Sequence, residues 1–161
     1  MIQVDTRQKT ARAAGAVGGN AGLPRYVESI VGPGWRVLDF GCGPAQLHVQ
    51  RLRESTGAQV VGYDLNMPWP RGHFDLVYAS NVLNVQPNIH HLNSTLSELH
   101  YHQGEGRLVV NYPSDPRKAG LSLRDLIKHI EFLGSWSEIK RLPESETGTS
   151  TPIFELIKES V

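Results

Sequence analysis

The sequence predicts an α/β fold with a doubly wound, mostly parallel sheet of about six strands. Short apolar segments alternate with segments whose apolar residues have helical spacing, a pattern typical of a parallel sheet with helices on both faces. Two glycines follow the first apolar segment, where a strand would turn into a helix. The 161 residues are enough for one domain. We therefore expect one domain over 1–161, with 1–22 as a flexible N-terminal segment or a lid.

The first predicted elements alternate between helix and strand. LPRYVESIV (23–31) places its apolar residues on one helical face, and the GPG turn (32–34) ends it. WRVLDF (35–40) is short, apolar and followed by glycines, which predicts a buried strand. AQLHVQRLRES (45–55) predicts a second helix, and AQVVGYD (58–64) predicts a second buried strand.

The same alternation continues through the middle of the chain. FDLVYASNVLNV (74–85) predicts a third strand that ends in polar residues, and 88–102 predicts a helix. GRLVVNY (106–112) predicts a fourth strand, and LSLRDLIKHIEFLG (121–134) another helix.

Two strands without an intervening helix close the chain. SEIKRLPE (137–144) and TPIFELIK (151–158) predict an antiparallel pair. A sheet that begins with parallel strands and ends in this pair is mixed.

Charge and cysteine content exclude several classes of protein. Sixteen basic and sixteen acidic residues cancel, so no overall field attracts nucleic acid or a membrane, although Arg7, Lys9 and Arg12 form a local basic cluster. Cys42 is the single cysteine, which excludes an internal disulfide and a cysteine-rich metal site. No apolar segment approaches the roughly 18 residues of a membrane span, and no signal-peptide core is present. We expect a cytoplasmic protein with no membrane contact.

Gly41 and Gly43 lie where ligands bind in doubly wound sheets, at the carboxyl end of the first strand. Glycine adopts backbone angles that other residues resist, and its missing side chain lets a ligand approach the main chain. The alternative interpretation is a tight turn with no ligand.

Asp64 ends the second predicted strand, about twenty residues after the glycines. An acid at this position in a nucleoside-binding sheet accepts hydrogen bonds from both ribose hydroxyls. The alternative is a solvated aspartate in a turn.

Two residues argue against a dinucleotide. Gln46 occupies the third position of G-x-G-x-x-G, where the dinucleotide fingerprint has glycine. Asp39 precedes the glycines, where its charge would repel a pyrophosphate. An acid there favours a cationic or amino-bearing ligand, and S-adenosylmethionine has an ammonium group, a sulfonium and a free ribose.

VLDFGCGPA (37–45), followed by VVGYD (60–64) and FDLVYASNVLNV (74–85), resembles a class I S-adenosylmethionine-dependent methyltransferase. The resemblance covers roughly residues 35–113 and implies a Rossmann-like core, although Ala45 replaces a common glycine. More narrowly, RVLDFGCG, GYDLNMPWP and VLNV are similar to short phage-type and DNA-phosphorothioation-associated methyltransferases. A phage-encoded protein would work in the cytoplasm of the host.

The resemblance implies where the cofactor would lie. The glycine turn would lie under its methionine part, with Asp39 facing the amino group directly or through water. Asp64 would hold the ribose, Leu65 would cover one face of adenine, and residues 80–82 would border adenine and the methyl donor. The implied cofactor contacts are Asp39, Gly41, Cys42, Gly43, Asp64, Leu65, Ser80, Asn81 and Val82. Cys42 itself is expected to be a small buried residue and not a nucleophile.

One edge unit of the family fold is missing. Only LNMPWPRGH (65–73) separates Asp64 from the next strand, and nine residues with two prolines cannot form both a helix and a strand. The second strand would then be a free edge through which copies could pair as a homo-oligomer. Trp69 or Met67 would replace the lost adenine wall, or Trp69 would simply pack over the edge.

The candidate catalytic residues are Asn81, which would border the methyl group and accept from a target amine, and Tyr112, which would line the substrate mouth. NYPSDP (111–116) superficially resembles the N-P-P-Y motif of amino-methylating DNA enzymes, but its position and internal order differ, so a strand ending in a proline turn is the preferred interpretation. Asn84 would contact substrate, cap the next helix or fix the loop.

Histidines cluster late in the chain without the spacing of metal ligands. We expect them on a solvated helix, and they are His90, His91, His100 and His102.

The function predicted from these residues is methyl transfer from S-adenosylmethionine, with S-adenosylhomocysteine as product. The acceptor is unresolved. The absence of a lid insertion favours nucleic acid or another macromolecule, a partner subunit, or residues 7–22 as a cover. The alternative is a non-catalytic S-adenosylmethionine-binding protein that sequesters the cofactor or supports a partner enzyme. A nicotinamide-dependent enzyme is disfavoured by Gln46 and Asp39.

Overall fold

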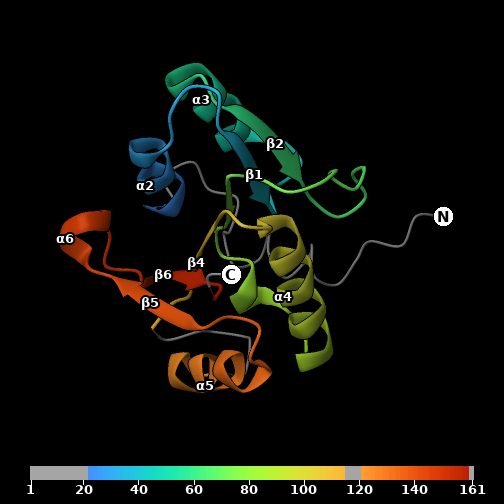
Figure 1. The fold of residues 1–161 in the computed structure, drawn as a ribbon, viewed down its shortest axis with the longest axis vertical. Coiled ribbons are helices and arrows are strands. Elements are labelled where there is room, and N and C mark those ends of the chain that lie inside the picture. The colour runs from blue at the N-terminus through green and yellow to red at the C-terminus, as the bar shows by residue number, and fades with distance from the viewer. Residues whose placement is uncertain (1–21, 115–120, 160–161) are drawn as a thin grey trace.

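A computed structural model describes residues 22–114 and 121–159. It forms a three-layered α/β domain in which a central sheet separates two sets of helices (Figure 1). In chain order the elements are α2 (Gly22–Ile30), β1 (Arg36–Phe40), α3 (Leu47–Thr56), β2 (Gln59–Tyr63), β3 (Leu76–Ala79), the 3₁₀ helix η1 (Leu83–Val85), α4 (Ile89–Gln103), β4 (Arg107–Asn111), α5 (Leu123–Leu133), β5 (Glu138–Leu142), α6 (Glu144–Thr147) and β6 (Ile153–Ile157).

The six strands lie in the order β2-β1-β3-β4-β6-β5. β1 pairs in parallel with β2 and β3, and β3 pairs in parallel with β4. β6 runs antiparallel to both β4 and β5. The predicted six-stranded, mostly parallel and mixed sheet is therefore confirmed. The strand order changes direction beside β1, so the carboxyl ends of β1 and β3 border a topological switch point, the usual ligand site in such sheets.

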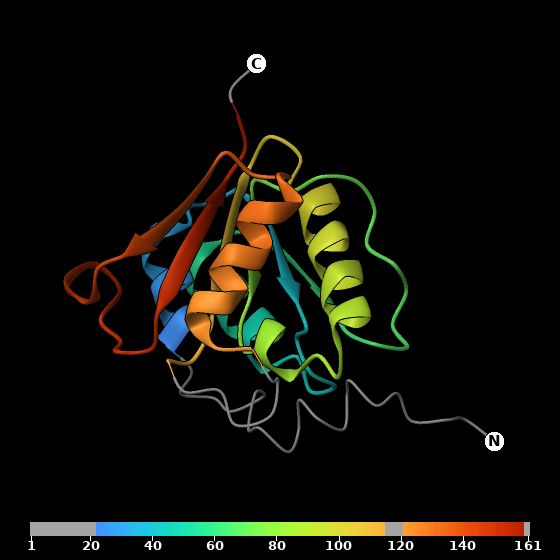
Figure 2. The same cartoon turned by 90° about the horizontal axis from the view of Figure 1, so that it is seen from below.

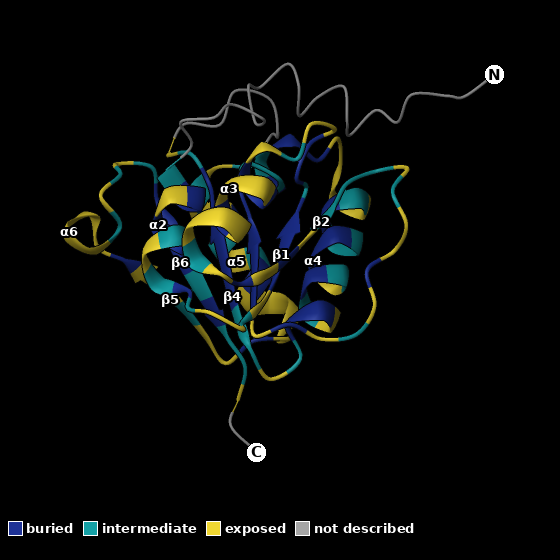
Figure 3. Ribbon diagram, turned by 90° about the horizontal axis from the view of Figure 1, so that it is seen from above, coloured by how far each residue is buried: buried dark blue, intermediate teal, exposed yellow. Residues whose placement is uncertain are grey.

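Helices cover both faces of the sheet, with α2 and α3 on one side and α4 and α5 on the other (Figure 2). Strand residues alternate between these layers. In β1, Val37 packs with the α2 and α3 layer, whereas Leu38 and Phe40 pack with the α4 and α5 layer. This alternation turns Asp39 toward the same side as Val37. Figure 3 shows the buried residues concentrated in the strands and on the helix faces that contact them, while α6 is exposed.

β2 is an edge strand, because within the described ranges its only partner is β1. Residues 64–75 connect β2 to β3 without a helix or a strand, as the missing edge unit predicted. Trp69 packs over this region. Its ring lies edge-on to Tyr63, with centroids 5.2 Å apart, and 4.9 Å from the ring of His102 on α4. Pairing of copies through β2 stays a prediction.

Three local expectations were wrong. β3 ends at Ala79, because Asn81 adopts φ +57° and the chain then turns into η1, so residues 80–85 do not extend the strand. The short helix α6 between β5 and β6 was not predicted. His102 is completely buried and not solvated, because the aromatic residues of the β2–β3 connection cover it.

In the described part of the chain no helix combines the length and the apolar character needed to cross a membrane. The basic cluster and all of the predicted lid except Gly22, which begins α2, lie outside the described residues. Asp115 and Pro116 of the NYPSDP motif lie outside them as well.

Candidate functional site

The glycine turn after β1 is held against the end of β2. Gly41 and Gly43 have φ of +86° and +75°, in the left-handed region that favours glycine. The N–H groups of Gly41 and Cys42 both donate to the carbonyl of Tyr63, at 2.7 and 3.0 Å. A Cβ atom at Gly41 would lie 2.5 Å from Cγ2 of Val82. A side chain at Gly41 would therefore collide with the segment after β3, so this position requires glycine.

Asp39 is a buried carboxyl at the end of β1, with 2% of its surface exposed. Tyr78 lies opposite it on β3, and its hydroxyl donates to Oδ2 of Asp39 at 2.7 Å. Burial raises the pKa of Asp39 to about 7; the hydrogen bond from Tyr78 opposes that rise, and the charge of Asp64 adds to it. Near pH 7 the Asp39 carboxyl is therefore about half-protonated, and a cationic ligand beside it would favour the ionised form.

Asp64 follows β2 directly and is half-buried. Its Oδ1 accepts a hydrogen bond from the N–H of Leu65 at 2.8 Å, which fixes the carboxylate beside the main chain. Since the charge of Asp64 raises the pKa of Asp39, both carboxyls belong to one electrostatic site. The structure thus brings the two predicted acids together on either side of the glycine turn.

The segment after β3 forms the next wall. The N–H of Asn81 donates to the side chain of Asn111 at the end of β4, and this bond supports the left-handed turn. The side chain of Val82 faces Gly41. The hydroxyl oxygen of Ser80 is buried and has no hydrogen-bond partner among the described residues. An orphaned hydroxyl beside a bare glycine turn is a feature that a bound polar ligand would satisfy.

Cys42 is buried between the two glycines. Its thiol donates to the Gly43 carbonyl at 3.3 Å and lies 3.8 Å from the sulfur of Met67. Burial raises the pKa of the thiol to about 12, and the charges of Asp39 and Asp64 contribute to the rise. A protonated, enclosed thiol packs well and is a poor nucleophile.

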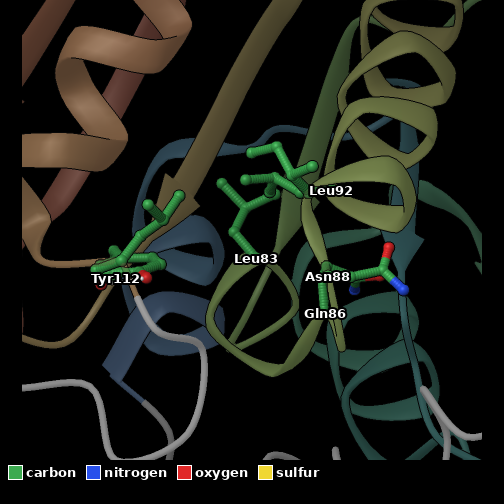
Figure 4. A pocket seen from close by; sticks show the side chains of 7 residues that line it. Leu83, Gln86, Asn88, Leu92 and Tyr112 are labelled. Carbon is green, nitrogen blue, oxygen red and sulfur yellow. Dashed lines mark hydrogen bonds between the residues drawn. The ribbon is translucent and has the colours of Figure 1, made fainter.

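Tyr112 follows β4 and is almost completely buried. Its hydroxyl donates to the carbonyl of Leu121 at 2.8 Å, and burial raises the pKa of the phenol. Tyr112 lines a pocket of about 240 Å³ together with residues of η1, the start of α4 and the chain before α5 (Figure 4). The pocket is lined by Leu83, Gln86, Asn88, Ile89, Leu92, Tyr112 and Leu121.

Three residues of the site were not identified from the sequence. Tyr78 lies within β3 and Asn111 ends β4, and only the folded structure shows that Tyr78 meets Asp39 and that Asn111 meets Asn81. Gly62 lies opposite Asp39 in β2, and a Cβ there would approach the side chains of Gln46 and Cys42 to 2.7 and 2.9 Å. The signal available for Asn111 was a polar residue at the end of an apolar strand.

Asn84 does not cap the helix that follows it. Asn88 does so instead, because its Oδ1 accepts from the N–H of His91 at 2.9 Å, while the buried Oδ1 of Asn84 lacks a partner among the described atoms. Across residues 22–114 and 121–159, no group of three or more potential ligands could hold a metal ion.

Neither protein-family models nor curated proteins match the sequence. Solved structures do match the fold. A TehB-like S-adenosylmethionine-dependent methyltransferase from Corynebacterium glutamicum aligns with a TM-score of 0.60 and 19% identity over 95% of each chain. Magnesium protoporphyrin IX methyltransferase from Synechocystis PCC 6803, solved with S-adenosylmethionine, aligns with a TM-score of 0.57 and 21% identity over 99% of this chain and 86% of that one.

A third structure is 1,6-didemethyltoxoflavin-N1-methyltransferase from Burkholderia thailandensis, solved with 1,6-didemethyltoxoflavin and S-adenosylhomocysteine. It aligns with a TM-score of 0.63 and 14% identity over 99% of this chain and 93% of that one. The chain has the fold of these class I methyltransferases. The narrower resemblance to phage-type and phosphorothioation-associated proteins stays a hypothesis.

Proposed function

We propose that this chain binds S-adenosylmethionine and transfers its methyl group to an acceptor. The observation that supports this most strongly is the pair of carboxyls, Asp39 and Asp64, at the ends of neighbouring parallel strands on either side of the bare Gly41 turn. Two of the solved neighbours described above contain S-adenosylmethionine or its demethylated product, which supports this cofactor.

The electrostatics of the site suit a cation. Asp39 is buried beside a second acid, and Tyr78 donates a hydrogen bond to it, but burial still disfavours its ionised form. An ammonium group near Asp39 would supply the missing positive charge. A pyrophosphate would meet two carboxylates, an interaction that burial makes strongly unfavourable.

The remaining contacts are assigned by position. Oδ1 of Asp64 accepts from Leu65, so Oδ2 would accept from the ribose hydroxyls, while Leu65 would cover adenine. Gly41 and Gly43 would let the methionine part of the cofactor approach the main chain, because glycine has no side chain of its own. Ser80 would find a polar partner on the ligand for its buried hydroxyl.

The cofactor supplies a methyl group on a positively charged sulfur, which needs alignment more than assistance. Among the described residues, Tyr112 donates its proton to a carbonyl and Cys42 keeps its thiol protonated, so neither is suited to act as a base. We infer that the acceptor provides its own lone pair and that the protein orients it. Asn81 would then be a positioning residue at the methyl group.

A non-catalytic binding protein is the second candidate. Neither Tyr112 nor Cys42 is available as a base, which favours this candidate, because a pure binding site needs none. Transfer to an acceptor that is already nucleophilic would need neither residue as a base.

The test combines binding with turnover on the full chain. Isothermal titration with S-adenosylmethionine measures the first step, and a labelled-methyl assay against small-molecule extracts, DNA, RNA and cell lysate measures the second. Binding followed by labelled product supports the methyltransferase. Binding without product in every arm supports the binding protein, and the absence of binding contradicts both.

A further inference from the structure

We propose that the methyl acceptor is a small, uncharged ring compound that binds in the pocket between η1, α4 and Tyr112. This inference rests on the proposed methyl transfer and adds the chemical class of the substrate. It also departs from the expectation of a macromolecular acceptor.

The first reason is the absence of charge. None of the seven described residues that line the pocket is charged, and four of them are leucine or isoleucine. An ionised ligand would find no partner of opposite charge among these described residues, and its desolvation would be costly. Apolar walls with few polar atoms instead favour a ligand that contributes hydrophobic contact area.

The second reason is that the polar residues are already engaged. Gln86 donates from Nε2 to the carbonyl of Val82 at 2.7 Å and accepts from Thr95 at 3.2 Å. Tyr112 donates to Leu121, and Asn88 caps α4. In Figure 4, Leu83 and Leu92 point into the space that Tyr112 closes, whereas the amide of Asn88 points away from it. A flipped nucleobase would find few partners for its hydrogen-bonding edges here.

The third reason is size. A cavity of roughly 150 Å³ lined by apolar side chains holds one benzene molecule. By the same ratio of volume to atoms, the pocket of about 240 Å³ would hold roughly ten non-hydrogen atoms. This matches a fused pair of rings or one substituted ring.

The pocket adjoins the glycine turn through shared walls. Val82 faces Gly41 and is followed by Leu83, which lines the pocket. Asn111 holds the backbone of Asn81 and is followed by Tyr112. A ligand between Leu83 and Tyr112 would therefore lie next to the segment that we assign to the methyl donor.

The experiment compares two probes of similar shape and different charge, naphthol and naphthalenesulfonate, on protein loaded with S-adenosylhomocysteine. We expect naphthol to bind at least about tenfold more tightly, because the sulfonate would bury an unpaired charge. Ile89→Trp fills the pocket from its half-exposed rim and should weaken naphthol binding about tenfold or more, with little cost to folding. Leu133→Trp, on the partly exposed end of α5, is the matched control and should leave naphthol binding unchanged.

Affinity for S-adenosylhomocysteine is measured on every variant and separates the two proposals. If the unaltered protein does not bind S-adenosylhomocysteine, the proposed function is contradicted. Naphthol binding can still be measured on the protein without S-adenosylhomocysteine. Equal or tighter binding of naphthalenesulfonate, or no effect of Ile89→Trp, overturns the pocket assignment. So does labelled-methyl transfer to DNA, RNA or protein that Ile89→Trp leaves unaltered.

Discussion

The two halves of the carboxyl edge of the sheet differ in charge. The ends of β1 and β2 present Asp39 and Asp64 around a bare main-chain turn. The ends of β3 and β4 lead to a pocket with no charged side chain among its described lining residues. The segment 80–86 separates the two halves and contributes side chains to both.

If the proposed function holds, this difference would distinguish the two ligands of the reaction. The carboxylates would select a cationic donor, and shape and apolar contact would select a neutral acceptor. Variants on the acidic side should therefore change the affinity for the cofactor strongly, and they should also change its pH dependence. Variants on the neutral side should respond to volume and not to charge.

The largest effect is expected for Gly41→Ala. The new Cβ would collide with Val82, and the alanine would have to adopt φ +86°. Gly34→Ala is the control, because Gly34 has φ +80° but nothing within 4 Å of its Cβ position. Both variants share a left-handed penalty of about 1–2 kcal/mol, and Gly41→Ala adds about 1–3 kcal/mol for the collision. Urea unfolding measures this difference, and Val82→Ala in the Gly41→Ala background should recover part of it.

Gly41→Ala should also weaken S-adenosylmethionine binding, while Gly34→Ala should leave it intact. Equal unfolding free energies and equal affinities for the two variants would remove the glycine turn from the site.

Asp64→Ala tests the outer carboxylate. Loss of a charged hydrogen-bond acceptor should weaken S-adenosylmethionine binding by about 1.5–3 kcal/mol, or roughly ten- to hundredfold. Asp125→Ala removes an exposed acid of α5 that is not among the residues assigned to the cofactor, and it should not change the affinity. Titration calorimetry on both variants decides the matter, and identical affinities would exclude Asp64 from ligand contact.

Asp39 predicts a pH-dependent affinity. Because its pKa is raised to about 7, binding of an ammonium group below that pH must displace a proton. Affinity should rise roughly tenfold per pH unit as the pH approaches about 7 from below. Calorimetry in two buffers with different ionisation enthalpies would detect the released proton. Asp39→Asn should abolish the release, and an unchanged proton count would contradict the assignment.

The same shift sets the sign for stability without ligand. The folded protein binds the Asp39 proton more tightly than the unfolded chain does, whose carboxyl titrates near the ordinary value of 3.8. The contribution of Asp39 to the free energy of unfolding should therefore fall as the pH rises from about 3.8 to about 7. Asp39→Asn should flatten that slope in urea titrations at several pH values.

Tyr112→Phe should have the smallest effect. Its hydroxyl donates to Leu121, so its loss should cost about 1 kcal/mol of stability. The ring that shapes the pocket remains, and turnover should stay within a few-fold of the original rate. A fall of a hundredfold or more, typical for a lost general base, would show that Tyr112 acts on the proton and that the neutral half is not governed by shape alone.

The sheet and both acids could be predicted because they depend on local patterns. Apolar segments of strand length, the glycines after WRVLDF and an acid at the end of the next strand are visible in sequence order. The missing edge unit followed from the short, proline-containing connection. Contacts between distant strands could not be predicted in this way. Tyr78 meets Asp39 because of the register of β1 and β3, and His102 is buried because a loop 30 residues earlier folds over it.

The free edge of β2 has a consequence for motion. Asp64 is attached to the strand with a single described neighbour, whereas Asp39 lies on β1, which is hydrogen-bonded on both sides. Amide hydrogens of β2 should therefore exchange faster than those of β1. A nucleoside bound by Asp64 would stabilise β2, so ligand binding should slow the exchange of amide hydrogens in that strand.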